Sequence, residues 1–326
     1  MIITRTPFRI SFVGGGSDLP SFYQEHGGAV ISSTINKYMY ISSHDFFEKN
    51  RIRTKYSVTE TVNSVAEIKH PILRTIMQRI NVNVGLEVSS IADVPAGTGM
   101  GSSSSFTVGT LHNMMAREGR LKEVNKSWLG EQACAVEIDD LKEPIGKQDQ
   151  YAAAFGGLNI IRFKKDGSVI VDPINIGDDN LKEFSKYLRL YYIGNQRSAS
   201  NILAIQNKEL LKADKIAAMK TMVSLVDEFA GFIKKSNWED CGRVIDENWA
   251  LKQSLANGIS NSIIQDIYLK GRRNGAWGAK LLGAGGGGFM LFFGPPSSHS
   301  TIDNALNMNP FPFELESLGS QVIFNK

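Results

Sequence analysis

Cysteine is nearly absent from this chain of 326 residues, which contains only Cys134 and Cys241. Both lie in helical patterns among apolar neighbours. A disulfide-stabilised fold uses several pairs of cysteines, and a thiolate metal site uses closely spaced ones. The cysteine content therefore argues against both kinds of protein.

Long apolar runs and a strong charge of either sign are also missing. A membrane-spanning helix needs roughly 18 apolar residues, and the longest candidate, Leu281–Phe293, is interrupted by glycines. The N-terminal stretch MIITRTPFRIS is strand-like and lacks the apolar core of a signal peptide. The formal net charge is only +3, with no dense block of Lys and Arg. We expect a cytoplasmic protein, monomeric or homodimeric, without membrane or nucleic-acid partners.

Proline is scarce as well, at 10 residues, whereas the 31 glycines are concentrated in three clusters. The clusters lie near residues 14–16, 97–101 and 283–288. Glycine between apolar segments marks positions where the backbone turns tightly or approaches a ligand closely. The three clusters are therefore candidates for a functional site, not signs of disorder.

Apolar periodicity predicts an α+β fold in two domains, residues 1–175 and 176–326. Partly alternating, β-branched segments indicate strands, and spacings of three and four indicate helices. The expected strands are Ile2–Thr6, Arg9–Val13, Ala29–Ile41 and Val82–Ser90, with a hairpin of Leu158–Phe163 and Ser168–Pro173. The expected helices lie near Ile72–Ile80, Ser103–Arg117 and Trp128–Leu141, followed by two long helical stripes that begin at Ile216 and Trp238.

The segment Pro95–Ser105, PAGTGMGSSSS, contains glycine at every second position from Gly97 to Gly101. A helical pattern follows it, so that unpaired N–H groups and the positive end of the helix dipole point to one place. This arrangement predicts a phosphate-binding loop; a flexible linker or a serine-rich helix cap is the alternative. The loop lacks both the lysine of a Walker loop and the spacing of the dinucleotide motif.

Arg9 and Asp18 belong to another glycine-containing segment, PFRISFVGGGSD. A charged arginine inside an apolar strand is unusual, and Asp18 is a candidate acceptor of hydrogen bonds from substrate hydroxyls. The alternative is a β-turn in which Asp18 is the N-cap of a helix that starts at Leu19-Pro20.

Glu137 and Asp149 are the acidic candidates of the segment EIDDLKEPIGKQDQYAAAFGG. In a helix, Glu137 has apolar neighbours one turn away, such as Ala133 and Leu141. A carboxylate in such surroundings is costly unless it is paired or binds a metal. Lys147 precedes Asp149 by two residues, and a nearby cation would hold such an aspartate ionised for work on a hydroxyl. A solvated helix face or a helix cap is the alternative for each acid.

The third glycine cluster, KLLGAGGGGFMLFF, is compatible with close packing in a sheet or with closure over a ligand. Together the segments supply the components of phosphoryl transfer. These are a loop for ATP phosphates, ligands for Mg²⁺, an aspartate for an acceptor hydroxyl, and a cation for developing charge. We expect an enzyme that phosphorylates a hydroxyl-containing small molecule.

These segments resemble the motifs of the GHMP kinases, the family of galactokinase, homoserine kinase and mevalonate kinase. PAGTGMGSSSS is similar to the family's P-x-x-x-G-L-G-S-S-A-A motif, PFRISFVGGGSD to its first motif and KLLGAGGGGFMLFF to its third. The resemblance implies an α+β fold, with an N-terminal domain like domain 2 of ribosomal protein S5 and a ferredoxin-like C-terminal domain. It also implies ATP and Mg²⁺ as cofactors.

The resemblance further implies a role for each motif residue. Asp149 is the implied catalytic acid/base, supported by Arg9, and the implied Mg²⁺ ligands are Ser103 and Glu137. The implied nucleotide-binding residues are Pro95, Gly97, Thr98, Gly99, Met100, Gly101, Ser102, Ser103 and Ser104. The implied substrate-binding residues are Gly16, Ser17, Asp18, Lys147, Arg197, Gly285 and Gly286, with Arg197 meeting a phosphate of the substrate.

Within the family, the forms TPFRISFVGGGSDLP and GKQDQYAAAFGGLN are similar to those of sugar-1-kinases acting on D-glycero-D-manno-heptose 7-phosphate. The likeness implies phosphorylation of the anomeric hydroxyl, on a route to GDP-heptose. Two departures from the family pattern are the serines at Ser104 and Ser105, where alanine is usual, and the glycines where galactokinase has Glu-His. The alternatives are a mannose-, fucose- or galactose-type sugar-1-kinase, a mevalonate-pathway kinase or decarboxylase, and a sugar sensor without catalysis.

Overall fold

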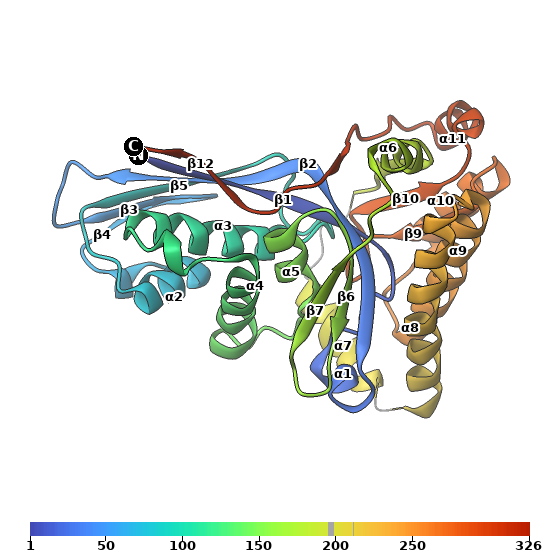
Figure 1. Ribbon diagram of the computed structural model, residues 1–326, viewed down its shortest axis with the longest axis horizontal. Coiled ribbons are helices and arrows are strands. Elements are labelled where there is room, and N and C mark those ends of the chain that lie inside the picture. Colours follow the sequence, from blue (N-terminus) through green and yellow to red (C-terminus); the bar gives the residue numbers. More distant parts are fainter. Residues whose placement is uncertain (195–198, 211) are drawn as a thin grey trace.

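The structure, a computed structural model, describes residues 1–194, 199–210 and 212–326 (Figure 1). Its strands are β1 (Ile2–Val13), β2 (Gly28–Asp45), β3 (Ile52–Lys55), β4 (Thr59–Val62), β5 (Leu86–Ala92), β6 (Leu158–Phe163), β7 (Val169–Pro173), β8 (Leu188–Tyr192), β9 (Gly278–Leu281), β10 (Phe289–Phe293), β11 (Leu315–Glu316) and β12 (Gln321–Asn325). Its α-helices are α1 (Pro20–His26), α2 (Pro71–Ile80), α3 (Ser102–Arg117), α4 (Lys126–Cys134), α5 (Gln148–Phe155), α6 (Asp178–Lys186), α7 (Ala199–Glu209), α8 (Ala213–Lys234), α9 (Trp238–Leu255), α10 (Ser262–Arg273) and α11 (His299–Leu306). The α+β class is confirmed.

The strands of the described residues form two sheets. The larger has nine strands and follows the path β12-β1-β2-β5-β3-β4; β6 and β11 pair with β2, and β7 pairs with β6. The 18-residue strand β2 pairs with β6 through its first half and with β5 through its second half. The smaller sheet is antiparallel, in the order β8-β10-β9. The end of β1 reaches toward this second sheet, so the turn after β1 lies where the two parts of the molecule meet (Figure 1).

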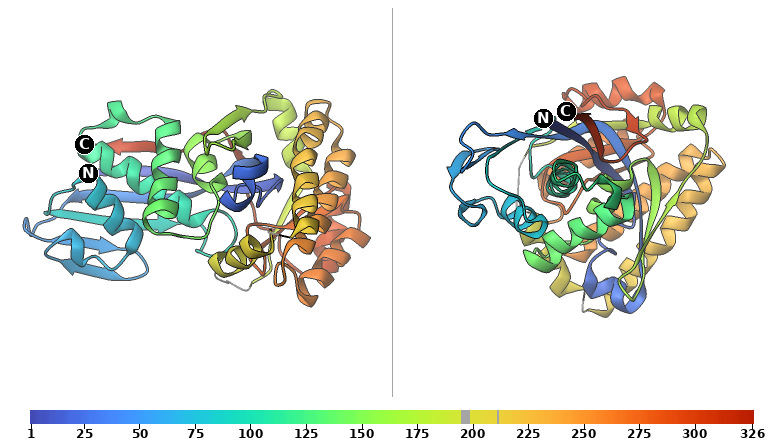
Figure 2. Two further views of the ribbon diagram at one scale, coloured as in Figure 1. Left: turned by 90° about the horizontal axis from the view of Figure 1, so that it is seen from below. Right: turned by 60° about the vertical axis from the view of Figure 1, so that its left-hand side comes forward.

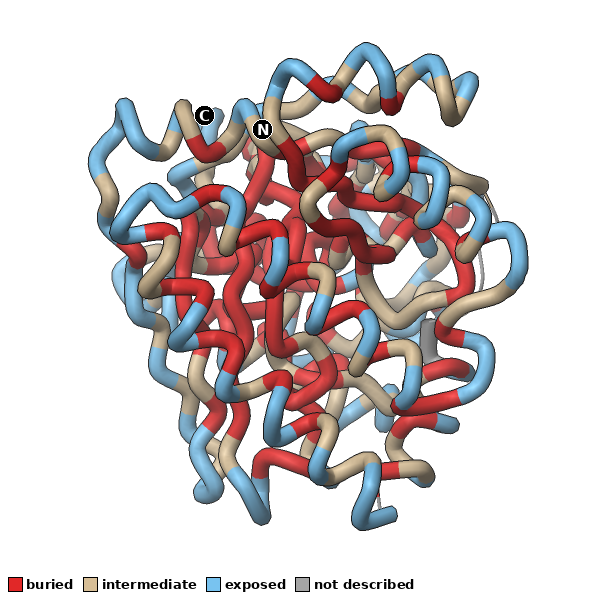
Figure 3. The backbone as a smooth tube through the Cα atoms, turned by 90° about the vertical axis from the view of Figure 1, so that its right-hand side faces the viewer, coloured by how far each residue is buried: buried red, intermediate tan, exposed pale blue. Residues whose placement is uncertain are grey.

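Helices α2, α3, α4 and α5 lie together on one side of the nine-stranded sheet, and α8, α9 and α10 stand beside the smaller sheet (Figure 2). Helix α3 packs on β1 and β2 and also contacts α2, α4 and α5, which explains why most of its residues are buried. Figure 3 shows buried backbone through the interior of the molecule and exposed backbone on the outer turns. In the described part of the chain, no helix combines the length of a membrane span with the apolar character that a span requires.

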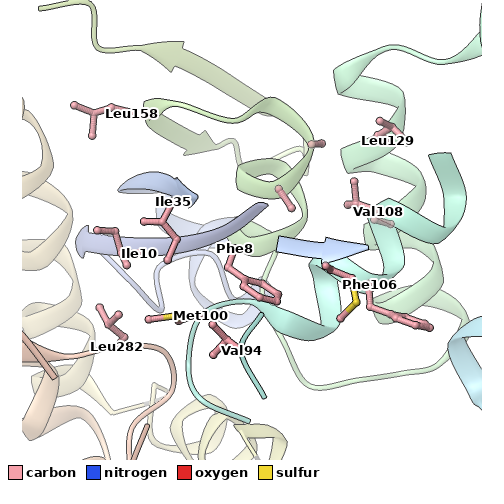
Figure 4. Packing of buried hydrophobic residues seen from close by; sticks show 14 of the residues in the cluster. Phe8, Ile10, Ile35, Val94, Met100, Phe106, Val108, Leu129, Leu158 and Leu282 are labelled. Atoms are coloured by element: carbon pink, nitrogen blue, oxygen red, sulfur yellow. The ribbon is translucent and has the colours of Figure 1, made fainter. Parts of the chain in front are cut away.

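One apolar cluster extends through both parts of the molecule. Phe184, before β8, stacks edge-on against Phe12 of β1, with ring centroids 5.4 Å apart. At the glycine loop, Met100 is fully buried near Ile10, Val94 and Leu282 (Figure 4). Full burial of a side chain of this size stabilises a fold by about 1.5–3 kcal/mol. Met100 therefore anchors the loop in the core.

The structure joins or divides three of the predicted elements. The strands expected at Ile2–Thr6 and Arg9–Val13 form one strand, because Pro7 sits at a register shift between β1 and β2 where its missing N–H is tolerated. The helix expected over Trp128–Leu141 ends as α4 and continues as a π-helical turn, Ala135–Asp140.

The predicted domain boundary near residue 175 stays a prediction. The last residues of the chain, however, return to the sheet that the N-terminal half forms. β11 pairs with β2 and β12 pairs with β1, so residues 315–325 complete the nine-stranded sheet. The two termini consequently lie side by side (Figure 1). Short strands whose partners lie some 280 to 320 positions away leave no local signal of their destination.

Candidate active site

A cavity of about 290 Å³ lies where the glycine loop, the turn after β1, the start of α5 and helix α9 meet. Many predicted residues line it: Arg9, Gly16, Asp18, Gly97, Gly99, Gly101, Ser102, Ser103, Ser104 and Asp149. A larger hollow of about 630 Å³ at the paired chain termini is lined by none of the predicted site residues that the structure describes. The smaller cavity is therefore the candidate active site.

The loop between β5 and α3 holds three glycines in the left-handed backbone region. Their φ angles are 76° at Gly97, 83° at Gly99 and 77° at Gly101, where a Cβ would be disfavoured. Gly101 is the N-cap of the 16-residue helix α3, and no side chain caps this helix. The first-turn N–H groups, on residues 102–104, therefore meet the cavity at the positive end of the helix dipole. This is an arrangement that binds phosphate oxygens.

The third glycine cluster supports this loop by backbone contact. A Cβ at Gly283 would lie 2.6 Å from the Cα of Gly99, and a Cβ at Gly288 would lie 2.3 Å from the carbonyl oxygen of Thr98. Gly283 and its neighbour Ala284 line the cavity. The cluster is therefore closely packed against the loop, and Gly283 combines this packing with a place in the cavity lining.

Several predicted binding residues surround the cavity without lining it. Gly285 and Gly286 face Ile259 instead, and Gly286 N–H donates to its carbonyl at 3.0 Å. Their role in substrate binding stays a prediction, and the glycine of this run that lines the cavity is Gly283. Others hold the local backbone: Met100 is in the core, Thr98 Oγ1 donates to the Pro95 carbonyl, and Ser17 bonds to the backbone of Ala29 on β2.

Replacing Gly99 with alanine is expected to destabilise the fold by roughly 2–5 kcal/mol, which combines left-handed strain and overpacking. A Cβ at Gly99 would lie 2.5 Å from the carbonyl oxygen of Leu282. Gly119 is the matched control: its φ is also positive, at 68°, but a Cβ there meets nothing within 4 Å. Gly119→Ala should therefore cost only about 1–2 kcal/mol. Urea denaturation of both variants measures the difference, and equal losses would contradict the packed loop.

Arg9 and Asp149 form a bidentate ion pair at the cavity. Arg9 Nε and Nη2 donate to Asp149 Oδ1 and Oδ2, each at 2.7 Å, and Nη1 donates to the carbonyl of Gly99 at 2.5 Å. Arg9 is buried in β1, whereas the Asp149 side chain is 24% exposed. Asp149 lies in the first turn of α5, where the helix dipole favours a carboxylate. The pair joins the predicted catalytic acid directly to the glycine loop.

Lys147 does not contact Asp149, contrary to the expectation from sequence spacing. Its Nζ donates to the carbonyl of Gly167 at 2.7 Å and lies 5.1 Å from the ring centroid of Tyr23. Residues two apart at the start of a helix do not share a face. Arg9 occupies the role that the spacing assigned to Lys147, and it comes from 140 positions away.

Glu137 is 1% exposed and accepts three hydrogen bonds. The donors are Ser103 Oγ at 2.6 Å, Ser104 Oγ at 2.8 Å and Gln150 Nε2 at 2.7 Å. Burial raises the pKa of the carboxyl, the three hydrogen bonds lower it in part, and the charge of Asp149 raises it further. The π-helical turn, a wider turn that is frequent at functional sites, carries Glu137 toward the start of α3.

The surroundings of Glu137 fit a magnesium ion. Its three hydrogen-bond donors are all neutral, and a cation would offset the cost of burying the carboxylate. Mg²⁺ commonly takes one or two oxygens from protein and the remainder from water and phosphates. The described residues contain no cluster of three or more acidic, histidine or cysteine side chains able to hold a metal by themselves. A metal held by Ser103 and Glu137 would therefore depend on oxygens of a bound ligand.

Asp18 binds the start of α5 and is not an N-cap of α1, which has no side-chain cap. Its Oδ1 accepts from the N–H of Gly16 at 3.0 Å, and its Oδ2 accepts from the N–H of Gln148 at 3.1 Å. Burial raises the pKa of Asp18, and Asp149 raises it further. A Cβ at Gly146 would lie 1.9 Å from Oδ2. A glycine at this position is therefore what lets the carboxylate reach the helix.

Two buried lysines from the C-terminal half also reach this part of the molecule, and neither was a predicted site residue. Lys252 of α9 lines the cavity, and Lys280 of β9 donates to the carbonyls of Ser11 and Phe12 at 2.7 and 3.0 Å. Burial lowers the pKa of Lys252 to about 8 and that of Lys280 well below its usual range. A lysine in a helical or strand pattern normally indicates a solvated position, so neither residue gave a signal. Arg197, the predicted phosphate contact, lies outside the described residues.

Comparison with known protein families matches both halves of the chain. The description "GHMP kinases N terminal domain" matches residues 63–157, and "GHMP kinases C terminal" matches residues 229–313. Together the two matches span more than half of the 326 residues. This chain belongs to the GHMP kinase family. It is accordingly an ATP-dependent kinase, an enzyme that transfers a phosphoryl group to an alcohol.

Relatives of this GHMP kinase include proteins with named substrates. A D-glycero-alpha-D-manno-heptose 7-phosphate kinase of Campylobacter jejuni is 27% identical over 320 residues, which cover 94% of this chain and 93% of the relative. The crystal structure of a D-glycero-D-manno-heptose 1-phosphate kinase from Bacteroides thetaiotaomicron has a TM-score of 0.79 at 23% identity, covering 99% of both chains. A sugar kinase structure from Campylobacter jejuni has a TM-score of 0.79 at 25% identity, covering 98% and 97%. The predicted family fold is thus confirmed over nearly the whole chain.

Proposed function

We propose that this kinase phosphorylates the anomeric hydroxyl of D-glycero-D-manno-heptose 7-phosphate, giving the 1,7-bisphosphate. Support comes from the Campylobacter relative, whose similarity spans nearly the full length of both chains. The observation that carries the proposal is the Arg9–Asp149 pair, because it puts a carboxylate beside an uncapped helix N-terminus in one cavity. A hydroxyl acceptor and a phosphoryl donor can meet between these two groups.

In the proposed step, the acceptor oxygen forms a bond to the γ-phosphorus of ATP. The bond from that phosphorus to the β–γ bridging oxygen breaks, and its electron pair leaves with ADP. Asp149 accepts the proton of the hydroxyl, and Arg9 holds Asp149 in place. Phosphoryl transfer passes through a loose transition state, so the hydroxyl needs little deprotonation beforehand. A carboxylate bound to a guanidinium therefore suits the step by orienting the hydroxyl and taking its proton late.

The remaining predicted residues have distinct tasks in this proposal. Backbone N–H groups of residues 102–104 hold nucleotide phosphates, as helix N-termini do. Ser103 and Glu137 hold Mg²⁺, which when bound neutralises negative charge on the phosphates. Asp18 accepts hydrogen bonds from hydroxyls of the sugar. The cytoplasm, where ATP is available, is the proposed compartment, and a monomer or homodimer stays the predicted assembly.

A substrate screen tests the proposed function. ADP release is measured with Mg·ATP and heptose 7-phosphate, mannose, fucose, galactose or mevalonate, and ³¹P NMR identifies the phosphorylated carbon. Heptose 7-phosphate is expected to exceed the unphosphorylated sugars in kcat/KM by about 10²-fold or more, as expected when a charged contact is lost. Turnover of fucose or mannose alone would transfer the assignment to another sugar-1-kinase. Turnover of mevalonate without any sugar would overturn the sugar class.

A further inference from the structure

Lys252 is a buried charged residue of α9 that the proposed reaction does not yet use. It is only 6% exposed, and its neighbours one turn away, Asn248 and Leu255, are buried as well. An ammonium group in such surroundings costs free energy, and burial lowers its pKa to about 8. An apolar side chain would be less costly here. The position therefore calls for an explanation other than stability.

The contacts of Lys252 leave it partly unsatisfied at the cavity. Its Nζ donates to the carbonyl of Gly15 at 3.1 Å and to Gln206 Oε1 at 3.2 Å, whereas an ammonium has three N–H donors. Among the described residues, no carboxylate lies within ion-pair distance of it. Gly16 lies between Lys252 and Asp18: its N–H bonds to Asp18 at 3.0 Å, and a Cβ on it would lie 3.0 Å from Nζ. Lys252 and Asp18 thus present a donor and an acceptor on one wall.

Two glutamine side chains beside this pair are fixed by its charges. Gln206 turns Oε1 to the Lys252 ammonium, which leaves its fully buried Nε2 without a partner. Gln148 turns Nε2 to Asp18 Oδ1 at 3.4 Å, which leaves its Oε1 without a partner. Flipping the Gln206 amide would turn its NH₂ group toward the Lys252 ammonium, where two donors would meet. Flipping the Gln148 amide would turn its oxygen toward the Asp18 carboxylate, where two acceptors would meet. Gln148 lines the cavity and Gln206 does not, so the unsatisfied atom that borders this wall is Gln148 Oε1.

We propose that Lys252 is a substrate-binding residue which, with Asp18, binds two neighbouring hydroxyls of the acceptor sugar. Lys252 donates its third N–H to one hydroxyl oxygen, Asp18 accepts from the adjacent hydroxyl, and Gln148 Oε1 offers a further acceptor to the same diol. This assignment rests on the proposed sugar kinase function and deepens it.

The charges of the cavity favour a neutral diol over an anion at this wall. The carboxylates of Asp18 and Asp149 influence each other electrostatically and would both repel a phosphate placed beside Lys252. Lys252 faces Asp18 and Gln206, and the nearby Lys280 already donates to backbone carbonyls of β1. A phosphate carried by the substrate consequently lies away from this wall, and the hydroxyls next to the acceptor carbon lie against it.

Steady-state kinetics of Lys252→Met and Lys280→Met test the assignment. Lys280 is a matched control, because it is also a buried lysine bound to carbonyls near the end of β1, but it does not line the cavity. Lys252→Met is expected to raise KM for heptose 7-phosphate by roughly 10-fold or more, the loss of one charged hydrogen bond, with KM for ATP within about 2-fold. Lys280→Met should lower the thermal midpoint and leave both KM values unchanged.

Kinetics with a 2-deoxy analogue of heptose 7-phosphate test the proposed contact between Lys252 and the sugar hydroxyl. The wild type is expected to lose roughly 10-fold or more in kcat/KM with the analogue, and Lys252→Met should discriminate far less, so that the two losses are not additive. Fully additive losses, or an unchanged sugar KM in a folded Lys252 variant, would overturn the assignment. If Lys252→Met does not fold, Lys252→Arg, which keeps the charge in a different shape, provides the same comparison.

The rates of the wild-type enzyme distinguish a failure of the Lys252 assignment from a failure of the proposed sugar kinase function. A wild type that turns over no sugar in the screen overturns the proposed function. If the wild type turns over heptose 7-phosphate and the Lys252 variants have the same KM for it as the wild type, only the role of Lys252 is overturned.

Discussion

Replacing Asp149 with asparagine is expected to lower kcat by about two to four orders of magnitude while KM for ATP stays close to that of the wild type. Asparagine keeps nearly the same shape but cannot take the hydroxyl proton. It can also satisfy only part of the Arg9 fork, in which Nε and Nη2 each bond one carboxylate oxygen at 2.7 Å. The proposed nucleotide contacts come from a different element, the start of α3, so ATP binding should be retained.

The measurement is ADP release under saturating acceptor, with ATP affinity from isothermal titration. Asp172→Asn is a suitable control, because Asp172 also pairs with an arginine, Arg162, but at 3.3 Å on the exposed strand β7. This control should retain wild-type kcat, since exposed pairs contribute little even to stability. An Asp149→Asn variant that turns over at the wild-type rate would remove Asp149 from the chemistry.

The second large effect is expected for Glu137→Gln: loss of about 10²-fold or more in activity at ordinary Mg²⁺ concentrations, partly restored by raising Mg²⁺. The carboxylate supplies the only negative charge in its hydrogen-bonded group of Ser103, Ser104 and Gln150. Because burial raises the pKa of Glu137, removing the charge relieves a cost to the metal-free fold. The thermal midpoint without metal should therefore stay unchanged or rise, while activity falls.

Mg²⁺ titrations of activity, together with thermal denaturation with and without Mg·ATP, test this expectation. Ser104→Ala is the control, because it removes one donor to Glu137 and keeps both implied metal ligands. It should shift the Mg²⁺ requirement less than Glu137→Gln does, because Glu137 keeps its charge and its donors Ser103 and Gln150. A Glu137→Gln variant with an unaltered Mg²⁺ requirement and a lower thermal midpoint would make Glu137 a purely structural carboxylate.

The sequence supported correct predictions wherever the physics is local. Glycines at every second position of the loop imply left-handed turns, and all three adopt positive φ at the start of α3. The hairpin around Asp166-Gly167 likewise follows from turn residues between two short apolar runs, and β6 and β7 pair there. Such features depend on a few consecutive residues, so their pattern is visible in the chain itself.

The sequence was less informative where a prediction depended on the direction in which a residue points. Lys147 is close to Asp149 in sequence, yet its side chain bonds to Gly167, because neighbouring positions at a helix start point to different sides. Gly285 and Gly286 could not be distinguished from Gly283, which packs on the loop and lines the cavity. In both cases the residue type was informative and its orientation was not.

The sequence by itself determined the α+β class, the glycine loop ahead of a helix and the identity of the charged residues, since these follow from periodicity, glycine spacing and composition. Only the tertiary structure decided which charges meet. Arg9 reaches Asp149 across 140 positions, Glu137 reaches α3 through a π-helical turn, and Lys252 reaches the turn after β1 across 237 positions. In each of these contacts a buried charge is compensated by a partner that is distant in sequence. The order of residues along the chain does not show which partner this is, because the two come together only when the sheets and helices pack.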